Sequence, residues 1–566
     1  MTRSGLEASR REEQDRLEPI QRRVDELIQL YGSPQASVAQ LLCDGNPPDN
    51  VAFRFVEQDL SYRDMTYGEL RARSERFAAA LWGIGVGPGD RVATLMGKTP
   101  DFVVAALAIW RLGAVQVPLF TAFAWPAIEL RLNASHARVL ICDSDQRAKV
   151  SESTSDSFRV ISGCGNGDRG SGLLREGDLD FFELLESAPQ GFPAAALGGD
   201  APMIHIFTSG TTGRPKGVVM PTRALATCTT YLEFSVDVRS DDRYWNAADP
   251  GWAYGLFCAI LAPMCEGVTS LLLNSGFSAQ LTADVLGRFG VTNLAAAPTV
   301  YRSLRASGLE RPAGLKLRCA SSAGEPLTPE VNQWAREWLG VDVFDHYGQT
   351  EAGMMVCNHH HPDLRSPLRE GSMGRDLPGW RTVVLEPDRD VPAPAGELGR
   401  LAVDLRGSPL AWFEGYDGER DRSSEKFSPD GRWYLTGDTA RRDEDNFVYF
   451  SARDDDVIIM AGYRIGPIEI ESVLMKHPAV AECAVIAVPD AVRGEVMEAF
   501  ITLGPALKPS AELERELQQL VKTSYAAHAY PRRVHFVESL PKTPSGKVQR
   551  YLLREQRRNE NVNSGG

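Results

Sequence analysis

The side chains best suited to chemistry are gathered in one short stretch, FTSGTTGRPKGVVM at residues 207–220. Its glycines let the backbone approach a ligand closely, its hydroxyl groups can donate hydrogen bonds, and its lysine supplies a positive point charge. The residues concerned are Thr208, Ser209, Gly210, Thr211, Thr212, Gly213 and Lys216. Such a set is suited to binding oxyanions, above all the phosphates of a nucleotide. A surface turn between two strands is the structural alternative.

The stretch differs from a Walker A loop, GxxxxGK[ST]. Counted from Gly210, that pattern requires glycine where Pro215 stands and a hydroxyl residue where Gly217 stands. The sequence therefore predicts a phosphate loop of another kind.

Five more stretches follow in an order that identifies a family. They are SSAGEPL at 321–327, YGQTEAG at 347–353, YLTGDTA at 434–440, ARDDDVIIMAGYRIGPIEIE at 452–471 and LPKTPSGKVQR at 540–550. Together with TSGTTGRPKGV, they resemble the motifs of the adenylate-forming superfamily, which includes acyl-CoA synthetases, firefly-type luciferases and the adenylation domains of peptide synthetases. The resemblance extends from about residue 40 to residue 555 and is strongest to acetyl- and medium-chain acyl-CoA synthetases.

The resemblance implies a role for each matched position. Catalytic roles fall to Lys547, Thr208 and Glu351, and Glu351 is also the implied ligand of Mg²⁺, which takes hard oxygen ligands. Besides the phosphate loop, the nucleotide-binding positions are Gly324, Glu325, Pro326, Tyr347, Gln349, Thr350, Asp438, Arg453 and Arg464. On local sequence alone, Asp438 could equally be an Asx-turn residue and Lys547 a solvated charge.

The family also implies motion of a small C-terminal domain. Asp455 would be the hinge about which this domain swings between two half-reactions, taking Lys547 away and bringing Gly462 to the pantetheine of CoA. One departure from the family pattern is Ala452, which stands where glycine is usual before Arg453. The implied cosubstrates and cofactor are ATP, CoA and Mg²⁺.

The implied chemistry solves a problem of leaving groups. A carboxylate is a poor acyl donor because its leaving group would be oxide. The acid is therefore first joined to AMP with release of pyrophosphate, and a thiol then displaces AMP. Positioning and charge stabilisation account for most of the catalysis of such a step.

The choice of acid depends on two positions. Trp252, in NAADPGWAYGLFCAILAPMCEGV at 246–268, is predicted to form one wall of the acyl pocket, and the Phe-Asp pair of amino-acid-activating domains is missing there. Gly348 stands where strict acetate enzymes carry a tryptophan, so we expect room for an acid of three or more carbons. The alternatives are an aryl-CoA (benzoate-type) ligase, an adenylating enzyme with another acceptor, or a nucleotide-binding protein without chemistry.

Alternating elements must position these residues. Strands are predicted at 90–97 and 114–119 and a further element at 137–145. Helices are predicted at 100–113 and at 328–340, where Thr328 is the expected N-cap and Pro329 the first helical residue. This alternation indicates an α/β fold with layered, mostly parallel sheets. Beyond about residue 455 the elements shorten, which indicates a small α+β domain. We therefore predict an N-terminal domain at 1–454 and a C-terminal domain at 455–566.

Charge and composition limit the kinds of molecule that the protein is expected to bind. The 566 residues carry a net charge of −14, which disfavours nucleic acid and anionic membranes, and no apolar run is long enough for a membrane span. Nine scattered cysteines without a CxxC pair fit a reducing compartment. We expect a cytoplasmic enzyme that acts on a small-molecule carboxylic acid, with a homo-oligomer left open.

Two further motifs are interpreted as decoys. GNGDRG at 165–170 satisfies the dinucleotide pattern GxGxxG, but the residues after it are too broken by Gly and Asp to open a helix. The histidines at 359–361 could suggest a metal, yet adjacent side chains point in different directions. The favoured interpretation is a surface loop for GNGDRG, and a loop or a pocket rim for the histidines.

Overall fold

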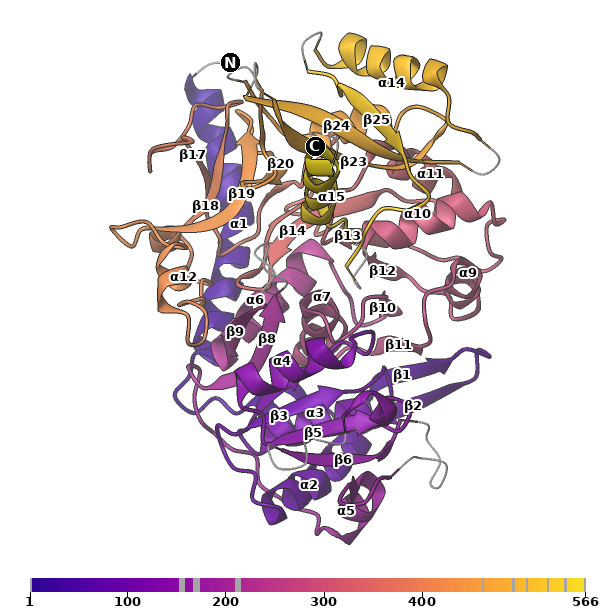
Figure 1. Ribbon diagram of the computed structural model, residues 1–566. Coiled ribbons are helices and arrows are strands. Elements are labelled where there is room, and N and C mark those ends of the chain that lie inside the picture. The colour runs from indigo at the N-terminus through magenta and orange to yellow at the C-terminus, as the bar shows by residue number, and fades with distance from the viewer. Residues whose placement is uncertain are drawn as a thin grey trace.

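The computed structural model describes residues 3–151, 158–165, 174–208, 215–460, 463–490, 494–504, 507–526, 529–543 and 547–563. For residues 3–14, 463, 464, 494 and 561–563 it describes the backbone alone. The chain forms an α/β N-terminal part with two large sheets and an antiparallel sheet, and a smaller α+β part at the C-terminal end, drawn in yellow at the top of Figure 1.

The largest sheet has the order β16-β15-β14-β13-β12-β10-β11-β1-β2. Its strands are β1 (Val51–Glu57), β2 (Tyr62–Thr66), β10 (Tyr244–Asn246), β11 (Ser270–Asn274), β12 (Asn293–Ala296), β13 (Cys319–Ala323), β14 (Val343–Gln349), β15 (Gly353–Cys357) and β16 (Arg375–Asp376). The strands from β1 through β11, β10, β12 and β13 to β14 pair in parallel, whereas β2, β15 and β16 run antiparallel at the edges. The carboxyl ends of the central strands therefore meet at one edge.

The second sheet has the order β7-β6-β5-β3-β4-β8-β9. Its strands are β3 (Arg91–Leu95), β4 (Val115–Pro118), β5 (Val139–Asp143), β6 (Arg159–Cys164), β7 (Leu179–Asp180), β8 (Pro202–Thr208) and β9 (Lys216–Pro221). All neighbours pair in parallel except β9, which pairs antiparallel with β8. The hairpin of β8 and β9 carries the predicted phosphate loop at its tip.

Two smaller sheets complete the fold. The antiparallel sheet β17-β18-β19-β20 consists of β17 (Thr382–Leu385), β18 (Leu398–Asp404), β19 (Trp433–Arg442) and β20 (Val448–Arg453). The C-terminal sheet consists of β21 (Ile458–Met460), β22 (Tyr463–Ile465), β23 (Val480–Asp490), β24 (Gly494–Leu503) and β25 (Arg533–Phe536). The C-terminal sheet packs on its own hydrophobic core around Ile470, Met497 and Leu517. This separate core supports the predicted domain division, whose boundary at 454/455 stays a prediction.

Helices cover and connect the sheets (Figure 1). In the N-terminal part they are α1 (Arg3–Tyr31), α2 (Tyr67–Gly83), α3 (Pro100–Arg111), α4 (Trp125–Ser135), α5 (Phe181–Ser187), α6 (Leu225–Thr230), α7 (Ala253–Gly255), α8 (Ala262–Glu266), α9 (Ala279–Arg288), α10 (Pro298–Ser307), α11 (Pro329–Trp338) and α12 (Arg420–Ser424). In the C-terminal part they are α13 (Pro467–Leu474), α14 (Ala511–Ser524) and α15 (Arg550–Asn563). No helix of the described chain is long and apolar enough to cross a membrane.

The main core joins the two large sheets. Helix α3 is buried from Asp101 to Arg111 and shares one hydrophobic cluster with Phe53 of β1, Val92 of β3 and Ile141 of β5. A helix that is apolar on all sides is stable only when it is buried on all sides, and this one lies between two sheets. The core therefore holds the two sheets in a fixed relation to each other.

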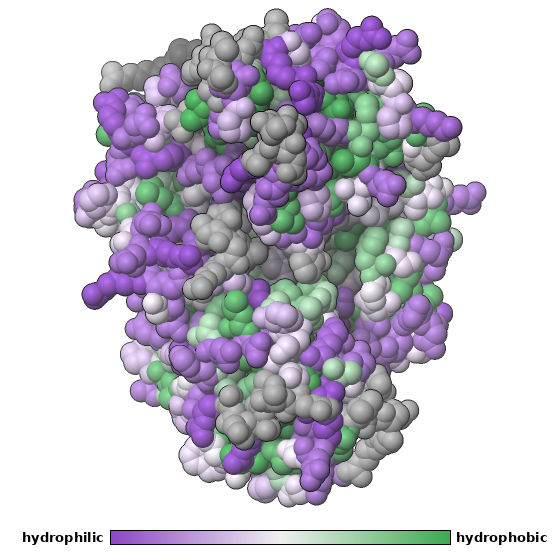
Figure 2. All heavy atoms as spheres, viewed as in Figure 1, coloured by the Kyte–Doolittle hydropathy of each residue, from purple (hydrophilic) through white to green (hydrophobic). Residues whose placement is uncertain are grey.

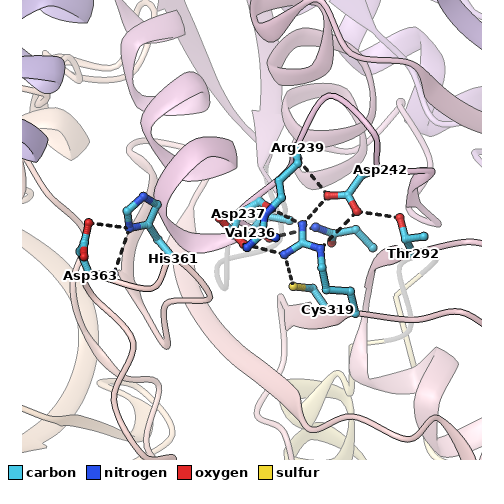
Figure 3. A network of polar contacts seen from close by, with 10 residues as sticks. Val236, Asp237, Arg239, Asp242, Thr292, Cys319, His361 and Asp363 are labelled. Carbon is cyan, nitrogen blue, oxygen red and sulfur yellow. Dashed lines mark hydrogen bonds and ion pairs between the residues drawn. The ribbon is translucent and has the colours of Figure 1, made fainter.

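The amino-terminal edge of the largest sheet is held by a polar network (Figure 3). The guanidinium of Arg318 donates to Asp237 Oδ2 at 2.5 Å and also contacts both carboxylate oxygens of Asp242. Thr292 donates to Asp242 Oδ1 at 2.7 Å, and Arg318 reaches Cys319 Sγ at 3.2 Å. Because Thr292 and Arg318 immediately precede β12 and β13, the network aligns the strands whose other ends carry site residues.

The elements predicted from the sequence are confirmed. The strands at 90–97 and 114–119 correspond to β3 and β4, the helix at 100–113 corresponds to α3, and the further element at 137–145 is the strand β5. Thr328 is the N-cap of α11 and Pro329 its first residue, although the Thr328 side chain makes no capping hydrogen bond.

Candidate functional site

The site lies where the edges of the two large sheets meet. Gly251 follows β10 and Phe120 follows β4; a Cβ atom on Gly251 would lie 2.6 Å from Phe120 Cα. Only glycine allows this close approach. Figure 2 shows that the surface is hollowed between the C-terminal part above and the second sheet below. Ligands of open α/β sheets bind at such carboxyl ends of strands.

Asp438 is the centre of a preorganised polar cluster. It is 2% exposed, and its Oδ2 accepts hydrogen bonds from the Tyr347 hydroxyl at 2.5 Å and from Gln349 Nε2 at 2.7 Å. The Arg453 guanidinium lies 3.2 Å from Oδ1 and is held charged, since Asp438 raises the pKa of Arg453. The structure thus brings Tyr347 and Gln349 of β14 together with Asp438, which lies 91 residues after Tyr347 in the sequence, and with Arg453.

Gln349 is itself oriented by a residue that the sequence analysis missed. Its Oε1 accepts a hydrogen bond from the Tyr434 hydroxyl at 2.7 Å. Tyr434 precedes Asp438 by four residues on β19, so the two-residue period of a strand could have placed both on one face. The amide nitrogen of Gln349 is thereby turned toward Asp438.

Glu351 lies buried close to this cluster. Its Oε1 accepts a hydrogen bond from the Tyr416 hydroxyl at 2.8 Å, and its exposed fraction is 9%. Lys426, also missed from the sequence, donates to the Thr436 carbonyl at 3.0 Å, and its electrostatic interaction with Glu351 partly opposes the effect of burial, which lowers the pKa of this lysine. Glu351 thus keeps one carboxylate oxygen free of the Tyr416 contact.

This donor set fits Mg²⁺. Among the described residues there is no group of three His, Cys, Asp or Glu side chains that could hold a metal by themselves. Mg²⁺ in nucleotide sites is usually bound by one or two carboxylates, with waters and substrate phosphates as its other ligands. A single buried carboxylate, Glu351, next to a phosphate loop matches that manner of binding.

The ends of the phosphate loop are well defined. Thr208 closes β8 and pairs with Lys216, the first residue of β9. The Lys216 ammonium lies 4.7 Å from the centre of the Tyr416 ring. The loop residues Ser209, Gly210, Thr211, Thr212 and Gly213 lie outside the described residues. The hairpin therefore places the lysine beside the residue that contacts Glu351.

Lys547 enters the site from the C-terminal part. Its ammonium lies 5.6 Å from the centre of the Trp252 ring. Its loop is closed by a pair of hydrogen bonds with Thr543, at 2.8 and 3.1 Å. Burial lowers the pKa of Lys547, whereas Glu325 acts to raise it. The lysine is thus held in the site, which argues against the alternative of a solvated charge.

The segment after β13 packs on Trp252. Gly324 has φ +100°, and a Cβ atom there would lie 2.8 Å from the edge of the Trp252 indole. Next to it, Glu325 forms an ion pair with Arg302 of α10 at 2.5 Å, another residue that the sequence analysis missed. Pro326 follows in the same segment. The glycine is therefore needed both for its backbone conformation and for the tryptophan.

The surroundings of Gly348 differ from those expected from the sequence, which predicts room for the acid at this position. A Cβ atom on Gly348 would contact the Gly353 carbonyl and lie 2.8 Å from Met354 Sδ. The pairing of β14 with β15 shifts register between Tyr347 and Gly348, which brings Met354 to this place. The space expected to be open beside Gly348 is thus occupied by the backbone of β15 and by the flexible side chain of Met354. Thr350 continues the turn that joins the two strands.

The predicted hinge lies between two anchored residues. The Asp454 amide donates to the Gly437 carbonyl at 3.0 Å in the N-terminal part. The Asp456 carboxylate accepts from Arg554 of α15 at 2.5 Å. Asp455 lies exposed between them. Farther on, Arg464 belongs to β22 but its side chain is not described, and Gly462 lies outside the described residues.

The structure describes the histidines at 359–361 and the first residue of GNGDRG, the two motifs interpreted as decoys. His359 and His360 are buried, and each hydrogen-bonds to a backbone carbonyl, that of Asp376 at 3.3 Å and that of Ala320 at 3.2 Å. Burial lowers the pKa of both rings, so both are neutral at physiological pH. In GNGDRG, Gly165 follows β6 with φ +104° and the residues from 166 to 170 lie outside the described chain.

Comparison with known proteins shows which family the chain resembles. The model of the AMP-binding enzyme family matches residues 43–416, and that of the AMP-binding enzyme C-terminal domain matches residues 469–547. Acetyl-coenzyme A synthetase of Bacillus subtilis (strain 168) is 33% identical over 516 residues, which cover 89% of this chain and 88% of that protein.

Two solved structures extend the comparison. The acyl-CoA synthetase of Brucella canis has 41% sequence identity and a TM-score of 0.73, with 95% of this chain and 98% of that chain covered. The anthranilate CoA ligase AuaEII in complex with anthranoyl-AMP has 28% identity and a TM-score of 0.84, with 94% and 98% covered. The chain therefore belongs to the AMP-binding enzyme family and is an adenylate-forming enzyme of the AMP-forming acyl-CoA ligase type.

Proposed function

We propose that this enzyme activates a carboxylic acid of three or more carbons as acyl-AMP and transfers the acyl group to CoA, with Mg²⁺ as the metal. The observation that carries the proposal is the position of Lys547 against Trp252. A lysine that can neutralise the charge of a reacting carboxylate thereby lies next to the predicted wall of the acyl pocket. The proposed partners are the acid, ATP and CoA.

The nucleotide would be held by groups that are already oriented. Asp438, fixed by Tyr347 and Gln349, would accept the ribose hydroxyls. Gly324, Glu325 and Pro326 would contact the adenine, and Lys216 with the loop hydroxyls would bind the phosphates. A site whose dipoles and charges are fixed in advance loses little free energy to reorganisation during the reaction.

Glu351 would hold Mg²⁺, which when bound neutralises charge on the phosphates, and Thr208 would act on the phosphates with the rest of the loop. Lys547 would stabilise the negative charge that gathers as the carboxylate oxygen approaches the α-phosphorus. For the thiol step, Asp455 would act as the pivot, Arg453 would stay at the ribose, and Gly462 and Arg464 would reach the site. The anchored neighbours Asp454 and Asp456 support a pivot confined to one residue.

The acid would lie against Trp252, with Met354 at the far side near Gly348. Methionine is unbranched and has several rotatable bonds, so such a wall adapts to acids of different length. This supports propionate and longer chains up to medium length. A benzoate-type ring is the second candidate, because the fold is similar over most of its length to the anthranilate CoA ligase AuaEII.

Pyrophosphate exchange with ATP tests the proposal. Linear acids of two to ten carbons, branched acids and benzoates would each be assayed with and without CoA. We expect exchange without CoA and AMP release with CoA, with an optimum at three or more carbons. An optimum at benzoates would favour the second candidate, and exchange that never leads to a thioester would overturn CoA as the acceptor. The cytoplasmic location stays a prediction.

A further inference from the structure

Tyr416 contacts both the predicted metal ligand, Glu351, and the predicted phosphate-binding lysine, Lys216. Its hydroxyl donates to Glu351 Oε1 at 2.8 Å, and the face of its ring lies 4.7 Å from the Lys216 ammonium. Tyr416 is 5% exposed and Glu351 is 9% exposed, so both contacts are shielded from water. Neither contact follows from the motifs in which Glu351 and Lys216 occur.

The backbone around Tyr416 is fixed by the hairpin of the phosphate loop. Tyr416 pairs with Val218 of β9 in an antiparallel bridge, and the Asp417 amide donates to the Gly217 carbonyl at 2.9 Å. The segment thus extends the sheet beside the strand that begins at Lys216. Any displacement of β9 moves Tyr416 with it.

The other side of Tyr416 is equally constrained. Its amide donates to Ser423 Oγ at 2.8 Å, and its ring lies 5.1 Å from that of Phe413 at an angle of 65°. Gly415 has φ +135°, and a Cβ atom there would lie 2.8 Å from Ser423 Oγ. Backbone and ring are therefore held from both sides, which leaves the hydroxyl little freedom except toward Glu351.

From these contacts we propose that Tyr416 is a positioning residue that sets Glu351 for the metal and Lys216 for the phosphates, and so couples metal binding to nucleotide binding. The inference rests on the proposed function, in which Glu351 holds Mg²⁺ and Lys216 binds phosphate. With Oε1 engaged by the tyrosine, Oε2 is the oxygen presented to the metal. The aromatic face holds the ammonium of Lys216 by a cation–π interaction until phosphate oxygens bind it.

The protonation state of the tyrosine agrees with this role. Burial raises the pKa of Tyr416, and the neighbouring Glu351 carboxylate raises it further. The hydroxyl of Tyr416 therefore stays protonated and able to donate across the working pH range.

Two substitutions separate the contacts. Tyr416→Phe removes the hydrogen bond to Glu351 and keeps the ring under Lys216, whereas Tyr416→Leu removes both. Tyr449→Phe is the matched control, because the Tyr449 hydroxyl also donates to a carboxylate, Asp443 at 3.0 Å, on the outer strand β20. Equilibrium binding would be measured by calorimetry with ATP at a series of Mg²⁺ concentrations, independently of any acid substrate.

For Tyr416→Phe we expect the Mg²⁺ concentration that supports half-maximal ATP binding to rise about tenfold, the effect of losing a hydrogen bond to a charged group. Excess Mg²⁺ should restore binding in this variant. Tyr416→Leu should also weaken ATP binding at saturating Mg²⁺. A merely structural role would instead lower the melting temperature and leave the Mg²⁺ dependence unchanged.

A Mg²⁺ dependence of Tyr416→Phe within twofold of that of Tyr449→Phe would overturn the inference. The failure of the proposed function is separately visible: wild-type protein would then bind Mg²⁺ and ATP cooperatively without exchange with any acid. If wild-type protein bound no ATP under these conditions, both the inference and the proposed function would be overturned.

Discussion

The Lys547 ammonium lies 5.6 Å from the centre of the Trp252 ring. The C-terminal loop that carries Lys547 and the carboxyl-end edge of the largest sheet therefore form one site. The lysine comes from a short loop ahead of α15 and the tryptophan from the turn before α7. In the proposed function this is the arrangement for adenylation, and its electrostatics lead to a prediction about pH.

Adenylation should lose activity as pH rises through the pKa of Lys547, which burial sets below the ordinary lysine value and Glu325 acts to raise. The ammonium form is the active one, so activity is present below this pKa and lost above it. Glu325→Gln removes the largest of the carboxylate contributions that raise this pKa and should move the alkaline limb to lower pH. The pH profile of pyrophosphate exchange measures this shift; an alkaline limb unmoved in Glu325→Gln would contradict it.

The width of the acyl pocket should depend on Met354. Met354→Ala removes the side chain whose sulfur lies beside Gly348, so kcat/KM for a longer acid should rise on the order of tenfold relative to propionate. Met354→Leu conserves volume and serves as the control. Equal changes for short and long acids in Met354→Ala would show that this residue does not border the acyl chain.

The C-terminal part should lose stability in acid through Glu498. Burial acts to raise the pKa of this carboxyl, but hydrogen bonds from His535 and Arg557, both at 2.7 Å, outweigh it and lower the pKa to about 2. A lowered native pKa means that the stabilisation is present above the unfolded value of 4.5 and is lost as pH falls toward 2.

Denaturant unfolding of wild type and Glu498→Gln between pH 3 and pH 7 measures this contribution, followed by a probe in the C-terminal sheet. The variant should be less stable at pH 7, and the difference should shrink as pH falls. A difference that stays constant over this range would assign the effect of the substitution to packing alone.

The polar network around Arg318, at the amino-terminal edge of the largest sheet, should stabilise the folded protein. Asp237 has φ +53°, a strained value for a residue other than glycine, and its backbone carbonyl and carboxylate both contact Arg318. Arg318→Met would leave the buried Asp242 carboxylate without its cation and Asp237 with Arg239 alone, and should lower the free energy of unfolding by about 2–3 kcal/mol.

Arg336→Met is the control for this prediction, since its pair with Asp342 is exposed and should contribute less than about 1 kcal/mol. Thermal or urea unfolding compares the two variants. Equal losses of stability would show that the network does not hold the strands.

The sequence was sufficient for much of the fold and for the identity of the motif residues. Some signals depend only on residues that are close in the sequence, so they can be recognised before the fold is known. Examples are the apolar run of α3 and the proline at which α11 begins, Pro329. The order of the motifs identified the family, and the Asp438 cluster then assembled from residues already named, Tyr347, Gln349 and Arg453.

What the sequence could not predict depends on long-range pairing. Tyr416 reaches Glu351 because its backbone pairs with Val218, a contact with no local signal. Met354 lies beside Gly348 because of a register shift between β14 and β15, and a shift of one residue in pairing cannot be read from composition. For the same reason the roles of Arg302 and Lys426 could be recognised only once the elements were packed.

The measurement that tests the central claim most directly is thioester formation from CoA, ATP and a panel of acids, with wild type and Lys547→Ala side by side. We expect a defined optimum at an acid of three or more carbons. Overall activity of the variant should fall by a factor on the order of a hundred or more, whereas thioester formation from preformed acyl-adenylate should persist. Equal activity of the two proteins, or acyl-AMP formation without any transfer to CoA, would contradict it.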